Sequence, residues 1–158
     1  FPHSEINFYS CETKIHQGKP NDYFQFPNDI LNKKFDGELA LSKLQQYFAE
    51  ENIGNALMEK SVFVGMGDLI RTEALYRAKI HPESLVKNIP EKKLIFLIIS
   101  AVNFADELVE HFKNDEVNSK ALIFEKKMCP KDKSEIQIAI STETNRKIYI
   151  CPKCQKLF

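Results

Sequence analysis

The stretch VGMGDLIRTEALYRAKIHP, residues 64–82, decides how this 158-residue chain folds. Gly65 and Gly67 precede a segment whose apolar residues have helical spacing, and a His-Pro pair ends it. Because a proline moves the residue before it out of the α region, we expect a helix over residues 69–79. Its predicted buried face is Leu69, Ala74, Leu75 and Ala78. The glycine turn either joins two packed helices or points exposed backbone amides at a phosphate.

Further helices are predicted on both sides of this stretch. A loop over residues 17–38, rich in Gly, Pro, Asn and Asp, precedes a helix whose apolar stripe is Leu39, Leu41, Leu44 and Phe48. A second helix is expected at about residues 53–62. Downstream, Pro90 suits the first turn of a long helix, which is predicted to be the centre of the core. Its apolar residues recur at intervals of three and four: Leu94, Leu97, Ile98, Ala101, Val102, Ala105, Leu108, Val109 and Phe112.

After the long helix the pattern changes to alternation. EIQIAIS (135–141) and RKIYI (146–150) predict a β-hairpin. The hairpin lies between CPKD, residues 129–132, and CPKC, residues 151–154. Two knuckles joined by a hairpin are typical of a zinc ribbon, in which thiolate coordination replaces a core too small to hold itself together. The predicted zinc ligands are therefore Cys129, Cys151 and Cys154.

The sequence leaves the fourth zinc ligand open. Asp132 stands where a second Cys or His is expected, and a carboxylate can bind zinc although structural sites are dominated by Cys and His. Cys11 could supply the ligand if the N-terminal segment packs against the ribbon, and His111 could if the end of the long helix does. We take Asp132 as the predicted ligand and interpret Cys11 as a lone buried thiol. A metal-free hairpin that keeps its shape by packing is the alternative.

The composition allows a real core, since 43% of the residues are hydrophobic, but it gives no net charge. Residues 120–158 nevertheless carry nine basic and four acidic side chains, which places the basic surface at the C-terminus. The four cysteines are spaced as metal ligands in a reducing compartment. The most apolar stretch, residues 93–112, is interrupted by polar residues before it could span a bilayer. The first residues lack the pattern of a signal peptide, so we expect an intracellular protein without a membrane partner, nuclear if the source is eukaryotic.

Three of these segments resemble the formamidopyrimidine-DNA glycosylase and endonuclease VIII family. Residues 56–82 are similar to its helix-two-turn-helix segment, in which GIGN is followed by EALFRAGIHP. NRKIYICPKCQ (145–155) resembles its zinc-finger ending, with Arg146 five residues before the first cysteine of the final pair. FPNDIL (26–31) is similar to the GPDPL that precedes the family's first helix. The order of the elements agrees over residues 26–158.

The resemblance implies a mainly α-helical fold. We expect a helix-two-turn-helix bundle over residues 26–118 and a small β-hairpin zinc ribbon over residues 119–158. Residues 1–25 are expected to hold a linker and edge strands of an upstream β-sandwich, because INFYSCETKIH (6–16) alternates loosely. The chain begins without Met and is interpreted as a fragment of a longer protein.

The catalytic part of the family is expected to lie outside this chain. Its nucleophile is the amine of the mature N-terminal residue, usually a proline followed by glutamate. Pro2 lies between Phe1 and His3 and is not expected to be that nucleophile. The resemblance implies the DNA-binding portion of a base-excision-repair DNA glycosylase and AP lyase, a monomer that grips damaged duplex or single-stranded DNA around a flipped nucleotide. The alternative is a non-catalytic nucleic-acid or protein-binding module of the same architecture.

The resemblance also implies DNA-binding residues. Gly65 and Gly67 would let main-chain N–H groups approach a phosphate at the positive end of the following helix. Asp68 replaces an asparagine that caps this helix and donates to a phosphate in the family; a carboxylate caps well but only accepts, and it repels phosphate. Arg146 is expected to clamp the phosphates that flank the extruded nucleotide.

The other matching positions have less direct roles. Gly54 stands where many relatives carry a phosphate-binding lysine, and Lys60 is its predicted substitute. Glu73 is expected to be a structural hydrogen-bonding residue. Tyr76 and Arg77 are interpreted as packing and surface residues.

Overall fold

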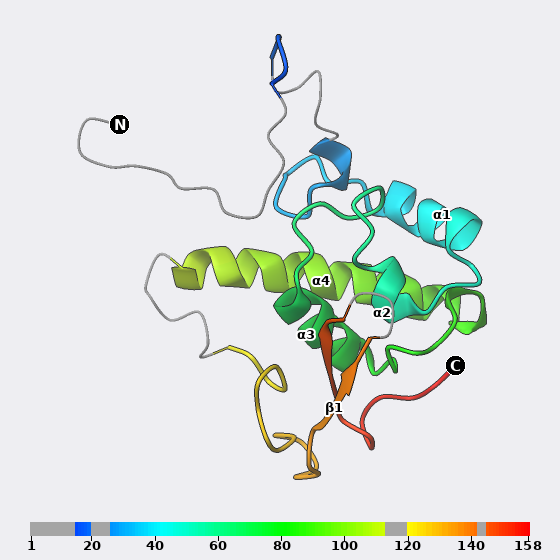
Figure 1. The fold of residues 1–158 in the computed structure, drawn as a ribbon, viewed down its shortest axis with the longest axis vertical. Helices are drawn as coiled ribbons and strands as arrows, with labels where there is room; N and C mark the ends of the chain where they lie inside the picture. The colour runs from blue at the N-terminus through cyan, green and yellow to red at the C-terminus, as the bar shows by residue number, and fades with distance from the viewer. Residues whose placement is uncertain (1–14, 20–25, 113–119, 142–144) are drawn as a thin grey trace.

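The computed structural model describes residues 15–19, 26–112, 120–141 and 145–158. In Figure 1 the helices form the upper part of the molecule, and the hairpin lies below α3 with the yellow and orange loops of the ribbon. The mainly α-helical fold with a C-terminal hairpin is the predicted one. Most of the strand segment predicted at residues 6–16 lies outside the described residues, and its last two residues are not in a strand.

The long helix α4 (Glu91–Phe112) is the centre of the helical part, as predicted. It begins after Pro90, whose carbonyl accepts a hydrogen bond from the Leu94 amide at 3.2 Å. Val109 and Phe112 were predicted to be buried but are exposed, because the last turn of α4 extends beyond the other helices (Figure 1). The buried residues of α4 are Leu94, Leu97, Ile98, Ser100, Ala101, Phe104, Ala105 and Leu108.

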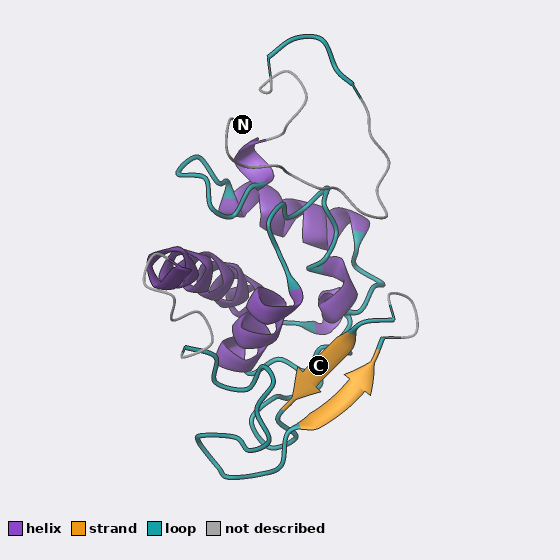
Figure 2. Ribbon diagram, turned by 60° about the vertical axis from the view of Figure 1, so that its left-hand side comes forward, coloured by secondary structure: helices purple, strands orange, loops and turns teal. Residues whose placement is uncertain are grey.

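The helix α3 (Asp68–Ala78) packs against α4 and ends at Lys79, which takes the left-handed conformation with φ of 58°. Burial of the predicted face is confirmed for Ala74, Leu75 and Ala78, but not for Leu69, and burial is not limited to that face. Leu69 is only partly buried, whereas the helix buries polar residues on its other sides. The reason is that α4 covers one side of α3 and the ribbon covers another, as Figure 2 shows. The buried residues are Arg71, Thr72, Glu73, Ala74, Leu75, Tyr76 and Ala78.

Two shorter helices complete the helical part. α1 (Gly37–Tyr47) is capped by Asp36, whose side chain accepts from the Leu39 amide at 2.9 Å. Leu39 itself is exposed, contrary to the prediction. α2 (Ile53–Ala56) is a single turn and not the longer helix predicted at residues 53–62. The chain turns after it, which carries Val62 and Phe63 into the helical core.

The predicted hairpin is confirmed. β1 (Gln137–Ile140) and β2 (Lys147–Ile150) are antiparallel, with Gln137 opposite Ile150 and Ile140 opposite Lys147. The ribbon has a small apolar cluster of its own, to which α3 contributes one residue: Tyr76, Ile123, Cys129, Ile136, Tyr149 and Cys151. No helix among the described residues has the length and apolar character needed to cross a membrane.

Polar side chains of α3 also join the two parts. The buried Glu73 carboxylate accepts hydrogen bonds from the backbone amides of Ile123 and Phe124, both at 2.9 Å. The structural hydrogen-bonding role predicted for Glu73 is therefore confirmed. Its partners lie on the chain that leads into the ribbon, so this carboxylate fixes the ribbon against the helical part.

Candidate nucleic-acid interface and metal centre

The turn before α3 leaves its backbone open to solvent. Gly65 has φ of +86°, and a Cβ there would lie 3.3 Å from Ile30, so conformation and packing both require this glycine. Gly67 is the N-cap of α3 and provides no side-chain cap. No atom lies within 4 Å of the place that a Cβ of Gly67 would take. Because the first amides of a helix have no intrahelical acceptor, this turn presents donors on an open surface.

Asp68 was expected to cap the helix, but this prediction was wrong. Asp68 is the first residue inside α3, and the cap is Gly67. Its carboxylate instead accepts a hydrogen bond from Arg146 and forms an ion pair with Arg71. Oδ2 lies 3.1 Å from Nη1 of Arg146, and Oδ1 lies 3.0 Å from Nη2 of Arg71. The structure thus brings the glycine turn and Arg146 together at one carboxylate, although 78 residues separate the two partners in the chain.

Arg71 is a residue of this site that the sequence analysis missed. Its side chain is only 1% exposed, and its Nη2 donates to the backbone carbonyl of Lys147 at 3.0 Å. Nη1 donates to the carbonyl of Gly54 at 3.4 Å. Burial lowers the pKa of Arg71 from its usual value, the charge of Asp68 opposes this, and the charge of Arg146 adds to it. Arg71 therefore holds the start of β2, which directly follows Arg146, against α3.

The sequence contained one signal for Arg71. Asp68 and Arg71 are three residues apart, a spacing at which opposite charges meet on a helix. Periodicity alone could not show that Arg71 would be buried, because the strand that covers it is 76 residues away in the sequence.

Gly54 packs closely against Pro82, whereas the phosphate contact predicted for Lys60 stays a prediction. A Cβ at Gly54 would lie 3.0 Å from Cβ and 3.1 Å from the carbonyl oxygen of Pro82. Any side chain at this position would therefore displace Pro82, so Gly54 serves close packing. Lys60 is exposed in the turn after α2, and no contact among the described residues brings it to the ion pair of Asp68 with Arg146.

Four predicted metal ligands lie together in the ribbon. The ligand atoms of Cys129, Asp132, Cys151 and Cys154 are all within 4.8 Å of one another. The Sγ atoms of Cys129 and Cys154 are 3.8 Å apart, and Oδ2 of Asp132 lies 3.0 Å from Sγ of Cys154. A tetrahedron with Zn–S bonds of ~2.3 Å has edges of about 3.8 Å, so the donor set fits a zinc ion.

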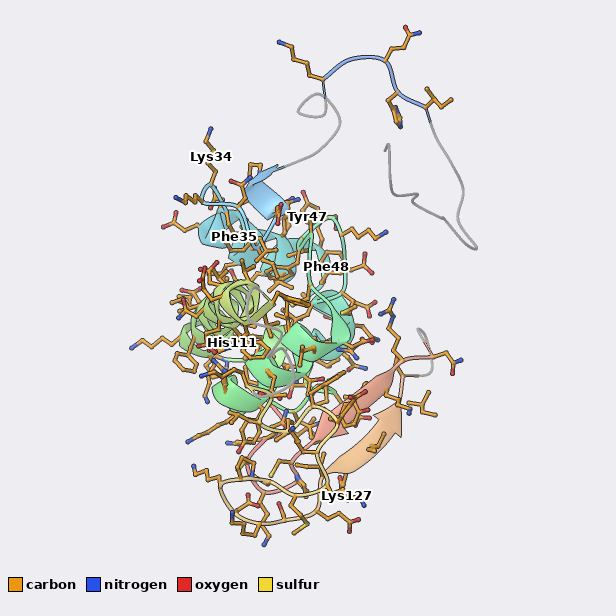
Figure 3. The ribbon with its side chains drawn as sticks, turned by 90° about the vertical axis from the view of Figure 1, so that its left-hand side faces the viewer. Lys34, Phe35, Tyr47, Phe48, His111 and Lys127 are labelled. Carbon is orange, nitrogen blue, oxygen red and sulfur yellow. The ribbon has the colours of Figure 1, made fainter. Side chains whose placement is uncertain are left out.

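Two other residues were considered as the fourth ligand. Cys11 lies outside the described residues. His111 is on α4, and Figure 3 shows it among the helices and away from the ribbon loop that carries Lys127. Of the two candidates that the structure describes, Asp132 and His111, the geometry favours Asp132.

Hydrogen bonds and burial shift the pKa values of Asp132, Cys154 and Cys129. Cys154 and Ser134 donate to the Asp132 carboxylate and hold its pKa below the usual range. Burial, together with the hydrogen bond to Asp132, raises the pKa of Cys154 to about 12. Burial alone would raise the pKa of Cys129. The hydrogen bond with Tyr76, whose Oη lies 3.2 Å from Sγ, acts together with backbone hydrogen bonds in the opposite direction, and the pKa of Cys129 is lowered. Zinc binding therefore has to release protons, above all from Cys154.

Comparisons with known proteins identify the family. The sequence profile of the formamidopyrimidine-DNA glycosylase H2TH domain matches residues 27–120. This chain belongs to the formamidopyrimidine-DNA glycosylase and endonuclease VIII family. It is 30% identical to endonuclease 8-like 2 of Mus musculus over 151 residues, which cover 94% of the chain and 44% of that relative. It is 31% identical to endonuclease 8-like L720 of Acanthamoeba polyphaga mimivirus over 158 residues, which cover 96% of the chain and 57% of that relative.

Solved structures agree with the family assignment. A viral DNA glycosylase superposes with a TM-score of 0.74 at 29% identity, covering 83% of this chain and 50% of that one. The formamidopyrimidine-DNA glycosylase of Lactococcus lactis, bound to DNA that contains an abasic site, has a TM-score of 0.73 at 22% identity and shares the fold. That match covers 87% of this chain and 53% of that one. The chain thus spans about half the length of the family members that it matches.

Proposed function

We propose that this chain is the DNA-binding portion of a base-excision-repair DNA glycosylase and AP lyase, and that it grips damaged DNA around a flipped nucleotide. One observation carries the proposal: Arg146 and the open amides at the start of α3 meet at the same place, where Asp68 lies 3.1 Å from Arg146. Two kinds of donor that suit phosphate, a guanidinium and helix N-terminal amides, converge there.

The charge and exposure of the two groups support a phosphate ligand. The side chain of Arg146 is 50% exposed and can reach solvent. Gly67 leaves open space where another residue would place a Cβ, so a phosphate oxygen can approach the backbone. Residues 120–158 carry the excess of basic side chains. A site of this kind binds the backbone of a nucleic acid and positions it without reading bases.

Catalysis in this proposal belongs to a part of the protein outside the matched region, since the chain spans about half of its relatives. The chain would hold the strand on both sides of the flipped nucleotide, and the nucleophilic amine would come from elsewhere. No residue described above is proposed to take part in the chemical step.

We further propose that Cys129, Asp132, Cys151 and Cys154 hold a structural zinc ion. Such an ion would cross-link the two knuckles and replace the large apolar core that the ribbon lacks. Its effect on DNA binding is indirect: β2 leads from Arg146 to Cys151, so fixing the knuckle fixes the strand that presents the arginine.

Binding of duplex DNA with an abasic-site analogue tests the proposal. We expect the Arg146→Ala substitution to weaken binding by about 1–3 kcal/mol, the range for charge-assisted hydrogen bonds to phosphate. The slope of log K against log salt should fall by about one unit, because one phosphate contact is lost. Lys127→Ala is the matched control: it removes an exposed charge at the end of the ribbon far from α1 (Figure 3) and should leave affinity within about twofold.

Equal effects of the two substitutions would contradict the proposed clamp. The same titration with single-stranded DNA shows which form the site prefers, because a clamp on one strand retains most of its affinity without the second strand.

The second candidate function is a non-catalytic nucleic-acid or protein-binding module. It is favoured by the carboxylate of Asp68, which occupies the partner position of Arg146 and makes the site weaker for phosphate. Borohydride trapping with the protein from the complete reading frame distinguishes the two functions. A covalent adduct with abasic DNA supports the enzyme, whereas DNA binding without any adduct supports the module.

A further inference from the structure

We propose that Asp68 is an internal anion that holds Arg146 in the absence of DNA, and that DNA binds there by exchanging a phosphate for this carboxylate. Asp68 then sets the DNA affinity of the site. The inference rests on the proposed function, because it assumes that Arg146 contacts a phosphate.

The carboxylate has the surroundings that a bound phosphate would have. Each of its oxygens lies about 3 Å from a guanidinium nitrogen, 3.0 Å for Arg71 and 3.1 Å for Arg146. It also stands at the first residue of α3, where the helix dipole favours a negative charge. Asp68 is thus held by three positive groups, the same three that would attract a phosphate.

The two arginines differ in how easily they can move away from Asp68. Arg71 is 1% exposed and is tied to the carbonyls of Gly54 and Lys147, so it cannot turn toward a ligand. The side chain of Arg146 is 50% exposed and extends from an exposed position at the start of β2. When DNA binds, Arg146 can therefore rotate to a phosphate while Asp68 stays paired with Arg71.

This exchange costs binding free energy in two ways. Arg146 gives up an ion pair, and the remaining carboxylate, 31% exposed, repels a phosphate that comes within a few ångströms of it. An asparagine in the same place would still offer an oxygen to Arg71 and could donate its amide to the phosphate. A carboxylate here therefore weakens the site relative to the amide.

The test compares five forms of the full chain in titrations with duplex DNA that contains an abasic analogue: the unmodified chain, three single variants and one double variant. We expect Asp68→Asn to bind about 5- to 30-fold more tightly at low salt, with a smaller gain at high salt. Asp106→Asn, which makes the same charge change on the exposed surface of α4, should bind within about twofold of the unmodified chain. When Arg146→Ala is already present, the gain from Asp68→Asn should drop below about threefold, because no arginine remains to be released.

Two outcomes overturn the inference but leave the proposed function standing. One is that Arg146→Ala weakens binding while Asp68→Asn leaves it unchanged or weaker. The other is that Asp68→Asn gives the same gain with and without Arg146, which would make Asp68 a source of general repulsion. If Arg146→Ala has no effect either, the proposed function itself fails.

A measurement on the unmodified chain covers the case in which Asp68→Asn destabilises the fold beside the buried Arg71. The carboxyl ¹³C resonance of Asp68 and the guanidinium resonance of Arg146 are followed as DNA is added. Exchange predicts that both resonances move together with the bound fraction. A carboxyl resonance that does not change at saturation contradicts the inference.

Discussion

The helical part and the ribbon are held together by different forces. The helical core contains twenty buried apolar residues, among them Leu44, Leu75 and Leu97. The ribbon cluster contains six buried residues, of which two are predicted zinc ligands and one, Tyr76, belongs to α3. Burial of apolar area can stabilise the first part. The second has less of it and, in our proposal, depends on zinc coordination together with polar contacts with α3.

This difference means that the ribbon has two supports that can be removed separately. One is the proposed zinc ion between its two knuckles. The other is the set of polar side chains on α3, chiefly Glu73 and Arg71, that bind its backbone. Removal of each support can be compared with damage to the helical core.

Loss of the metal should have the largest effect. We expect Cys151→Ser, or a strong chelator, to unfold the ribbon, because structural zinc sites contribute about 10–16 kcal/mol of apparent binding energy. Circular dichroism should still show α1, α3 and α4, while amides of β1 and β2 exchange rapidly with solvent. Lys153→Ala, which changes the residue between the two cysteines and keeps both, is the control. Retention of hairpin protection without metal would show that packing alone holds the ribbon.

Damage to the helical core should affect both parts. Leu97 is fully buried in α4, and we expect Leu97→Ala to reduce the free energy of unfolding by about 2–5 kcal/mol. The ribbon should unfold in the same transition, since α3 supports it. Ile99→Ala removes a similar volume from an exposed position of the same helix and should cost much less. Two separate transitions in urea would contradict the dependence of the ribbon on the helices.

Removal of the Glu73 carboxylate should loosen the contact between the two parts. Glu73→Ala leaves two buried backbone amides without their acceptor, which we expect to cost about 2–4 kcal/mol. Glu73→Gln keeps an acceptor oxygen and should cost less. Urea unfolding measures the loss, and hydrogen exchange at residues 123 and 124 locates it. Equal stability of the Ala and Gln variants would argue against the hydrogen bonds as the cause.

The smallest expected effect is a pH dependence of the folding stability that comes from one ion pair within the helical part. The hydrogen bond from Arg77 lowers the pKa of Glu107, and burial only partly opposes it. A lowered pKa in the folded state contributes stability above the unfolded value of ~4.3 and loses it as the pH falls through the folded value. Because Glu107 is 43% exposed, we expect less than about 1 kcal/mol.

Thermal unfolding between pH 7 and pH 3 measures this contribution. The difference between the unmodified chain and Glu107→Gln should be present at pH 7 and should vanish at the acid end. Asp106→Asn, next to it on α4, is the control. Parallel pH profiles for the unmodified chain and Glu107→Gln would show that the ion pair of Arg77 with Glu107 does not contribute to stability.

Local patterns were sufficient to predict most of the elements. The hairpin and α4 follow from alternation and from spacing of three and four, because each pattern depends on residues close in the sequence. The length of α2 and the burial of α3 were mispredicted, since both depend on contacts with residues that are distant in the sequence. The contact of Arg71 with Lys147 is an example, at a separation of 76 residues.

The sequence predicted which type of site to expect, but it did not predict which side chains contact one another within each site. The cysteine spacing and the position of Asp132 indicated a metal centre, and the structure brings the Asp132 carboxylate close to the three thiols. The resemblance drew attention to Arg146 and to the glycine turn. It could not indicate that Asp68 links them, because an ion pair across 78 residues is a property of the folded chain.

The attachment of β2 to α3 through Arg71 has a consequence for the mechanics of the proposed complex. The backbone on both sides of the site belongs to one rigid unit, so little conformational entropy of the main chain would be lost when DNA arrives. The spacing between the two phosphate donors is thereby fixed in advance. A duplex whose phosphates do not match it would have to bend, and sequences or lesions that bend easily would then be preferred without any contact to their bases.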